Sequence, residues 1–419
     1  MANQLILLIF TGLIIGISKC FENTNDAVIP RERFTAVWTR GRDLNYTYID
    51  YEAVDCLLAW GEVKDDLIKY AHDRNTEVQP MTGDPGISKF TNRTFMYETI
   101  QTFVEEVKNR NYDGWNFDFE GDTYTPQMKE NWVAFLNGLK NEFQKFSPPK
   151  KITVAIPFSP MEIYCLDGRC YPYTKMVNII DYFVIMGYDA EEDWWSLNHY
   201  GHSTDPFYRL YKGLREYIDC LELPPYKFIL ALPWYNWKIK CLKNQEPTDG
   251  NRPKDRKYQC SKRSLNEYDD KLNYKTTVRA FQDVKNRVDA QGNDISKDAP
   301  NNYYWSEVED SFYFHVKDPN HPRDIYEYWI NAVPGNFTPW VRKLQLAVDS
   351  GMSGLGLWAT HHLDYENYQS QEEKEFNDEM WKTFREYSSK LKPLVDSPFK
   401  NDEYMESWCR RYWDRYVSV

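Results

Sequence analysis

The chain has 419 residues, which is enough for one large domain or two ordinary ones. Its formal net charge of −12 argues against nucleic acid and anionic membranes as partners. Its 15 Trp, 32 Tyr and 22 Phe suit an ordinary packed core, and they also suit stacking on the flat faces of sugars. We expect a monomer.

The N-terminus carries one apolar run, residues 5–17. This run is too short to span a bilayer and lies at the start of the chain, which is typical of a signal-peptide core. No Lys or Arg precedes it, a departure from the usual pattern. Cleavage near Ser18 and Cys20 would remove residues 1–20, and we expect no later segment to cross a membrane. The sequence therefore predicts a secreted or lysosomal protein.

Short apolar or aromatic runs then alternate with longer amphipathic stretches. The predicted strands are residues 34–39, 54–60, 77–81, 114–120, 152–158, 180–188, 228–234 and 354–358. The predicted helices include residues 63–73, 95–109, 127–146 and 206–220. Eight strands with intervening helices are the pattern of a (β/α)8 TIM barrel, an α/β fold, which we expect over residues 21–391. In that fold the catalytic groups lie at the C-terminal ends of the strands.

Two further segments depart from the simple alternation. The connection between the seventh and eighth strands is an insertion, residues 237–351, with a hairpin-like stretch at 303–316 and a helix near 339–350. We expect the insertion to form a wall of the cleft. A helix at 372–391 would close the barrel. Residues 392–419 form a C-terminal appendage, whose Trp408, Trp413 and Tyr416 we expect to dock on the barrel.

The fourth predicted strand is the most informative stretch of the chain. Because alternate side chains of a strand point the same way, Asn116, Asp118 and Glu120 share one face, while Phe117 and Phe119 share the other. Like charges this close raise the pKa of at least one carboxyl. A protonated carboxyl beside an ionised one is what general acid catalysis on a glycosidic bond needs. The plain alternative is a strand whose acids face water or pair with Arg.

Other polar or aromatic residues recur at the ends of predicted strands. They are Tyr188, Asp189, Trp234 and Trp358. Several such residues at one rim of a barrel predict a site. For the two Trp residues, core packing is the alternative, because a barrel rim also buries aromatic rings. Trp194 and Trp195 follow the sixth strand and could form a stacking platform or a loop cluster that shields solvent.

The cysteines and sequons fit an oxidising compartment. We expect local disulfides between Cys165 and Cys170 and between Cys241 and Cys260, with Cys56 as a buried thiol. No cysteine pair has the spacing of zinc ligands. Glycosylation sequons occur at three positions, Asn45, Asn92 and Asn336, the last weakened by Pro339.

Four motifs together resemble glycoside hydrolase family 18, the chitinases and their relatives. They are residues 113–120 (DGWNFDFE), 186–189 (MGYD), 233–235 (PWY) and 354–358 (GLGLW). The resemblance covers about residues 33–390 and implies a (β/α)8 barrel. Within the family, Asn116 and residues 158–160 (FSP) resemble the chitobiase branch. The chain departs from that branch at residues 329–331 (WIN) and at Asn236, which puts the preferred substrate length in doubt.

The resemblance also implies a mechanism and residue roles. Glu120 would protonate the leaving glycosidic oxygen and then serve as the base for water. The nucleophile would be the substrate's own 2-acetamido oxygen, an exception among glycosidases. Asp118 would orient the acetamido N–H, Tyr188 would bind the acetamido carbonyl, and Trp358 would form the apolar floor. The remaining candidates would line or support the pocket: Asn116, Met186, Asp189 and Trp234. Asp113 is expected to buttress the strand.

Two classes of function remain open from the sequence. The first is a glycosidase acting on β-1,4-linked N-acetylglucosamine, as in chitobiose, chito-oligosaccharides and the N-glycan core. The second is a secreted chitin-binding lectin without turnover, which retention of Asp118, Glu120 and Tyr188 argues against. Phosphate loops, dinucleotide fingerprints and a nucleophile elbow are not found, so no cofactor is expected. Adjacent His361 and His362 seldom chelate a metal alone, and no metal site is predicted. Endo or exo cleavage cannot be read from the sequence.

Overall fold

The computed structural model describes residues 32–416 with the exception of several segments. Those segments are residues 43, 122, 124, 161–168, 191–202, 243–258, 261–269, 274–278, 281–285, 289–293, 296–302, 308, 319, 322–323, 364, 366–367, 369 and 400–402. The predicted signal peptide, Cys165, Trp194 and Trp195 therefore lie outside the described residues. From Arg33 onward the chain forms one compact unit.

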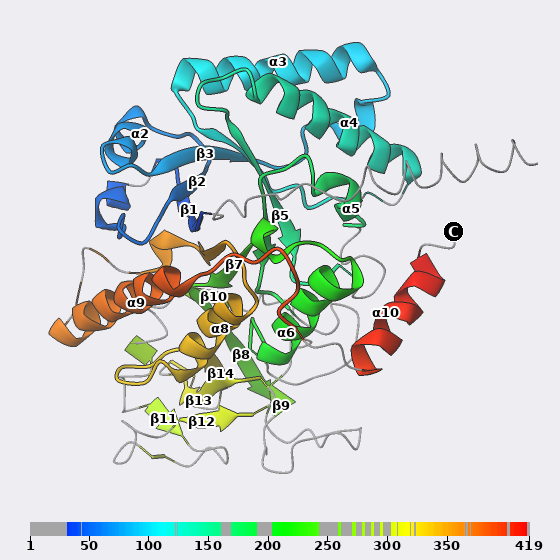
Figure 1. Ribbon diagram of the computed structural model, residues 1–419. Helices are drawn as coiled ribbons and strands as arrows, with labels where there is room; N and C mark the ends of the chain where they lie inside the picture. Colours follow the sequence, from blue (N-terminus) through cyan, green and yellow to red (C-terminus); the bar gives the residue numbers. More distant parts are fainter. Residues whose placement is uncertain are drawn as a thin grey trace, which may run out of the picture. The chain divides into compact units, whose positions relative to one another are not determined.

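Eight parallel strands close into a barrel (Figure 1). They are β1 (Ala36–Arg40), β2 (Cys56–Trp60), β3 (Glu77–Thr82), β4 (Gly114–Phe117), β5 (Lys151–Pro157), β6 (Tyr182–Met186), β7 (Phe228–Pro233) and β15 (Gly354–Trp358). β1 pairs with both β2 and β15, which joins the two ends of the sheet. The prediction of a TIM barrel is confirmed. Strand boundaries agree with the predicted ones to within two residues, except that β4 ends at Phe117 instead of residue 120.

Helices follow most of the barrel strands. They are α2 (Asp65–His72), α3 (Arg93–Arg110), α4 (Pro126–Phe143), α5 (Tyr173–Met176), α6 (Phe207–Arg215), α8 (Thr338–Asp349), α9 (Gln371–Lys390) and α10 (Glu403–Tyr416). At the start of α3 the Asn92 side chain caps the helix, because it accepts hydrogen bonds from Thr94 N and Phe95 N. Single-turn elements are η1 (Leu44–Tyr48), η2 (Ile87–Lys89), η5 (Pro225–Lys227), η9 (Thr360–His362) and a π-helix, η4 (Glu216–Cys220). No helix within the described ranges is both long and apolar enough to cross a membrane.

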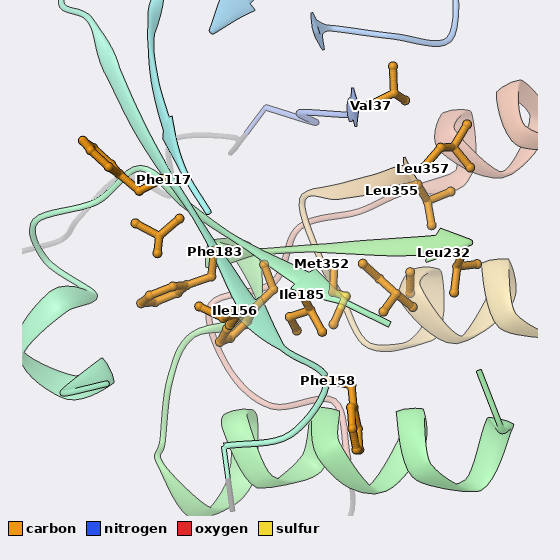
Figure 2. Close-up of a cluster of buried hydrophobic side chains, with 14 of the residues drawn as sticks. Val37, Phe117, Ile156, Phe158, Phe183, Ile185, Leu232, Met352, Leu355 and Leu357 are labelled. Carbon is orange, nitrogen blue, oxygen red and sulfur yellow. The ribbon is translucent and has the colours of Figure 1, made fainter. Parts of the chain in front are cut away.

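Strand alternation divides the barrel side chains between two layers. The outer layer packs under the helices, and Figure 2 shows part of it, including Phe117, Ile156, Phe183, Ile185, Leu232, Leu355 and Leu357. The inner layer fills the barrel and includes Trp38, Leu58, Val184 and Ala231. Gly356 lies on the inner face, where an added Cβ would come within 2.8 Å of the Ala36 carbonyl oxygen. Only a glycine therefore permits this approach of β15 to β1.

The predicted insertion forms a second, antiparallel sheet. Its strands are β8 (Tyr235–Leu242), β9 (Gln259–Cys260), β10 (Asp270–Asn273), β11 (Arg287–Val288), β12 (Tyr304–Ser306), β13 (Ser311–Lys317) and β14 (Ile325–Ile330). β8 begins two residues after β7 ends, so the sheet grows directly from the rim of the barrel. The predicted hairpin is confirmed as β12 and β13.

The C-terminal helix α10 is fastened to the barrel by a long-range disulfide between Cys220 and Cys409. Trp408 Nε1 also donates a hydrogen bond of 2.8 Å to Glu216 Oε1. The expectation that Trp408 docks on the barrel is confirmed, whereas the side chains of Trp413 and Tyr416 lie outside the described residues. The sequence did not predict this disulfide, because the two cysteines are 189 residues apart.

Candidate active site

The end of β4 places two carboxyl groups at the C-terminal rim of the barrel. The strand ends at Phe117, but Asp118 N still donates a 2.8 Å hydrogen bond to Thr82 O of β3. Phe117 and Phe119 belong to the outer core, as the alternation predicts. Tyr171 Oη donates to the carbonyl oxygen of Phe119, which fixes the backbone between the two acids. Glu120, whose side chain is 50% exposed, has Arg169 Nη1 3.5 Å from its Oε1.

Asp118 is the carboxyl whose pKa is raised. Burial is the main cause, and the neighbouring charge of Glu120 adds to it, whereas the Arg169 guanidinium lowers it; together they bring the pKa of Asp118 to about 7. Its Oδ1 is buried and has no hydrogen-bond partner among the described residues. A buried acceptor of this kind is costly unless another group meets it. Asp118 is therefore placed to receive a donor from a ligand.

Asn116 lies two residues before Asp118, on the same face of the strand and deeper in the barrel. Its Nδ2 donates a 2.8 Å hydrogen bond to Thr153 Oγ1, and Thr153 Oγ1 donates a 2.8 Å bond to Gln79 Oε1. All three side chains are fully buried. Asn116 thus belongs to a polar layer beneath the two acids and supports the site from below.

The end of β6 contributes Met186, Tyr188 and Asp189. Met186 and Tyr188 are both buried in the inner layer. The Tyr188 hydroxyl has no partner among the described residues, and burial, followed by the charge of Asp118, raises its pKa well above the usual value. Asp189 adopts a left-handed backbone with φ of 50° and accepts a hydrogen bond from Tyr235 Oη. The rim thus holds a second polar atom, the Tyr188 hydroxyl, that is ready for a ligand.

Trp358 at the end of β15 lies among aromatic rings from β1, from β2 and from the end of β6. It is stacked on Trp60, with ring centroids 5.1 Å apart, and meets the edge of Trp38 at 5.4 Å. The Tyr188 ring lies 6.1 Å away. Trp358 remains partly exposed and provides an apolar surface beside the polar groups.

Trp234 is not part of this group, contrary to the sequence-based expectation. In β7, Leu230 and Leu232 face the outer layer, and Trp234 has the same parity. It is fully buried, and its ring lies 4.7 Å from that of Trp381 in α9. Tyr235 faces inward instead, 6.0 Å from Tyr188. Counting the alternation of side chains along β7 would have predicted that Tyr235, and not Trp234, faces the inside of the barrel.

Arg169 and Trp60 are the other site residues that the sequence reasoning missed. Trp60 ends β2 with inward parity, so alternation could have found it. Arg169 comes from the loop after β5, and no local pattern indicates that it reaches Glu120.

The remaining candidates lie elsewhere. Asp113 buttresses β4 as expected, and its Oδ2 lies 2.8 Å from His72 Nε2 and accepts from Val78 N at 2.9 Å. His361 lies against the Trp60 ring, and no group of three metal-ligating side chains occurs in the part of the chain that the structure describes.

The structure describes part of the predicted cysteine pattern, and the two predicted pairings stay predictions. Cys56 is free and buried, as predicted. Cys170 and Cys241 each belong to a disulfide, and Cys241 faces Cys260 in the register of β8 and β9. Cys165 and the side chain of Cys260 lie outside the described residues.

Comparison with known proteins identifies the family. Residues 84–365 match Glycosyl hydrolases family 18. The chain belongs to this family. The protein is therefore a glycoside hydrolase.

Curated relatives agree with this assignment, and a solved structure shares the fold. "Probable di-N-acetylchitobiase 2" of Dictyostelium discoideum is 25% identical over 358 residues, 81% of this chain and 83% of the relative. The di-N-acetylchitobiase of Rattus norvegicus is 23% identical over 341 residues, 80% of this chain and 83% of the relative. The GH18 chitinase from Cycas revoluta in complex with (GlcNAc)3 has the same fold, with a TM-score of 0.61 at 13% identity, over 84% of this chain and 99% of that one.

Proposed function

We propose that this family 18 enzyme hydrolyses β-1,4-linked N-acetylglucosamine, as in chitobiose, chito-oligosaccharides and the N-glycan core, with retention of the anomeric configuration. The observation that carries the proposal is the pair of unpartnered polar atoms, Asp118 Oδ1 and Tyr188 Oη, beside the exposed Glu120. One is an acceptor and the other a donor, which is what an acetamido N–H and C=O require. The names of the relatives point to the same class of substrate.

In the first step Glu120 gives its proton to the glycosidic oxygen. The bond between that oxygen and C1 breaks, and its electron pair stays with the leaving oxygen. The acetamido carbonyl oxygen of the same sugar then bonds to C1, which leaves an oxazolinium ion. Asp118 holds the acetamido N–H and stabilises the developing positive charge, and Tyr188 donates to the acetamido oxygen.

In the second step water attacks C1. Glu120, now a carboxylate, takes the proton of that water, and the bond from C1 to the acetamido oxygen breaks. Two successive inversions at C1 restore the original configuration. Trp358 would lie under the sugar ring as an apolar floor, while Met186, Asp189 and Asn116 would hold the walls and base of the pocket.

Asp118 also governs the supply of protons to this site. With its pKa raised to about 7, Asp118 carries a proton at mildly acidic pH while Arg169 lies against Glu120. Below about pH 7 Asp118 brings a proton into the site before substrate binds. Binding of the acetamido N–H favours the carboxylate form of Asp118, so this proton passes to Glu120, the group that donates it to the glycosidic oxygen. Turnover should therefore need acidic to neutral conditions.

Product analysis on chito-oligosaccharides of two to six units, labelled at the reducing end, tests the proposal. We expect N-acetylglucosamine products, retention by NMR of the first-formed anomer, and no cleavage of cellobiose, which has no acetamido group. Cleavage of cellobiose at a comparable rate would exclude substrate assistance. Tight binding without any cleavage would favour the lectin alternative. The length series also shows whether cleavage is endo or exo.

We also propose that the mature protein works in the secretory route, in lysosomes or outside the cell, after removal of residues 1–20. Four described cysteines, Cys170, Cys220, Cys241 and Cys409, are disulfide-bonded, which fits an oxidising compartment. Asn45 and Asn92 are the proposed glycosylation sites. Asn336 is a weaker candidate because its Nδ2 donates to Tyr303 Oη. N-terminal sequencing and a mass shift on deglycosylation test these points.

A further inference from the structure

The loop that follows β5 places a buried arginine, Arg169, beside the acids of the candidate active site. Arg169 is 8% exposed, and its Nη1 lies 3.5 Å from Oε1 of Glu120, whose side chain is 50% exposed. An arginine on a protein surface loses side-chain entropy when it is held in one geometry, which limits the worth of most surface ion pairs. Burial already holds the Arg169 guanidinium in place. The ion pair therefore restricts the position of the exposed partner, Glu120.

The residues next to Arg169 are tied down on their C-terminal side. Cys170 is disulfide-bonded. Tyr171, itself buried, donates its hydroxyl hydrogen bond to the carbonyl oxygen of Phe119. Segment 169–171 therefore contacts segment 119–120 twice, once through the backbone of Phe119 and once through the carboxyl of Glu120. Such a double attachment resists displacement of one segment relative to the other.

The charge of Arg169 reaches the other groups of the site. It lowers the pKa of Asp118, Tyr171 and Tyr188, against the opposing effect of burial. The titratable and charged groups that face this part of the rim are Asp118 and Glu120 after β4, Arg169 and Tyr171 after β5, and Tyr188 and Asp189 after β6. A positive charge among three acids reduces the net charge that the site must hold.

We propose that Arg169 is a positioning residue for the catalytic acid: it holds Glu120 at the rim and stabilises the carboxylate that remains after the proton has passed to the leaving oxygen. This inference rests on the function proposed above. The cation lies beside the carboxylate that Glu120 carries between the two steps, when Glu120 must act as a base.

The test compares Arg169→Gln with Arg169→Lys. Gln keeps part of the buried stem without the charge, while Lys keeps the charge without the planar fork. Arg110→Gln is the control, because Arg110 is the last residue of α3, before β4, whereas the two acids follow β4, and its partner is Asp65. We expect Arg169→Gln to lower kcat about 10-fold and to move the alkaline limb of kcat/KM about one pH unit higher, since the charge that lowers the pKa of Asp118 is gone. Arg169→Lys should keep the limb near that of the wild type.

A second readout separates this inference from the proposed function. The pKa of Asp118, followed by carboxyl NMR, should rise in Arg169→Gln and stay near the wild-type value in Arg169→Lys and Arg110→Gln. If the wild type cleaves no N-acetylglucosamine oligosaccharide, the proposed function fails, but this titration still tests the role of Arg169 in the site. The inference is overturned if Arg169→Gln moves neither the limb nor the titration, or if Lys restores no more activity than Gln. If Arg169→Gln fails to fold, Arg169→Lys still tests the inference. An alkaline limb of kcat/KM that moves to higher pH in Arg169→Lys would overturn it.

Discussion

Asp113 and Asp118 lie at opposite ends of the same short strand, and their carboxyl groups differ in the partners that the protein provides. Asp113 precedes β4 and has partners in the protein: His72 Nε2 at 2.8 Å, Val78 N at 2.9 Å and Lys150 Nζ at 3.7 Å. Asp118 follows β4, and its buried Oδ1 has no partner among the described residues.

The difference separates a carboxylate that stabilises the fold from one kept for a ligand. Hydrogen bonds and nearby cations make the ionised form of an acid favourable, whereas burial without them makes it costly. The raised pKa of Asp118 records that cost. Such local instability is common where a protein keeps polar groups for chemistry. We therefore expect changes at the C-terminal end of β4 to alter activity and changes at its N-terminal end to alter stability.

The largest effect should come from Glu120→Gln. The amide keeps the shape of the acid but has no transferable proton, so we expect turnover to fall about 10²- to 10⁴-fold. Oligosaccharide binding, measured by calorimetric titration, should be retained within a few-fold. Turnover close to that of the wild type would show that the acid is another residue.

Asp118→Asn and Asp113→Asn form a matched pair that tests the comparison directly. We expect Asp118→Asn to lower kcat about 10²-fold, since it weakens the group that stabilises positive charge in the transition state. Asp113→Asn should leave kcat within about two-fold but lower the free energy of unfolding by about 1–3 kcal/mol, because it weakens paired hydrogen bonds. Steady-state kinetics and urea unfolding measure the two effects. Similar losses of kcat in both variants would break the comparison.

The pH dependence of stability should distinguish the same two residues. The pKa of Asp118 is raised in the folded protein from 3.8 to about 7. Its contribution to stability is thus full below about pH 4 and is lost as the pH rises through about 7. Relative to the wild type, Asp118→Asn should gain stability between pH 5 and pH 8, by up to a few kcal/mol. An unfolding free-energy difference that stays the same at both pH values would contradict the raised pKa.

The smallest effects should separate the two tryptophans at neighbouring strand ends. Trp358→Phe should raise KM about 10-fold, because the ring under the sugar becomes smaller. Trp234→Phe should leave KM unchanged and cost about 1–2 kcal/mol of stability, as expected for a smaller ring in a packed core. Kinetics and thermal unfolding of both variants check this. A raised KM in Trp234→Phe would show that Trp234 contacts the substrate after all.

Local sequence patterns were enough to predict the barrel and the core of the candidate site. Period-two alternation in short apolar runs marked the eight strands, and the same alternation put Asp118 on the inner face and Phe117 on the outer one. These features depend on neighbours along one strand, so local pattern is sufficient. The error at Trp234 has the same origin, because the motif 233–235 indicated a site without deciding which of its rings faces inward.

The contacts between distant segments, by contrast, could be seen only in the folded chain. The disulfide between Cys220 and Cys409 and the approach of Arg169 to Glu120 join residues that no periodic pattern relates. The raised pKa of Asp118 was also open from the sequence, since it depends on the burial of that carboxyl inside the rim. Burial and charge proximity are properties of the folded chain, because they arise only when separate strands and loops meet at one end of the barrel.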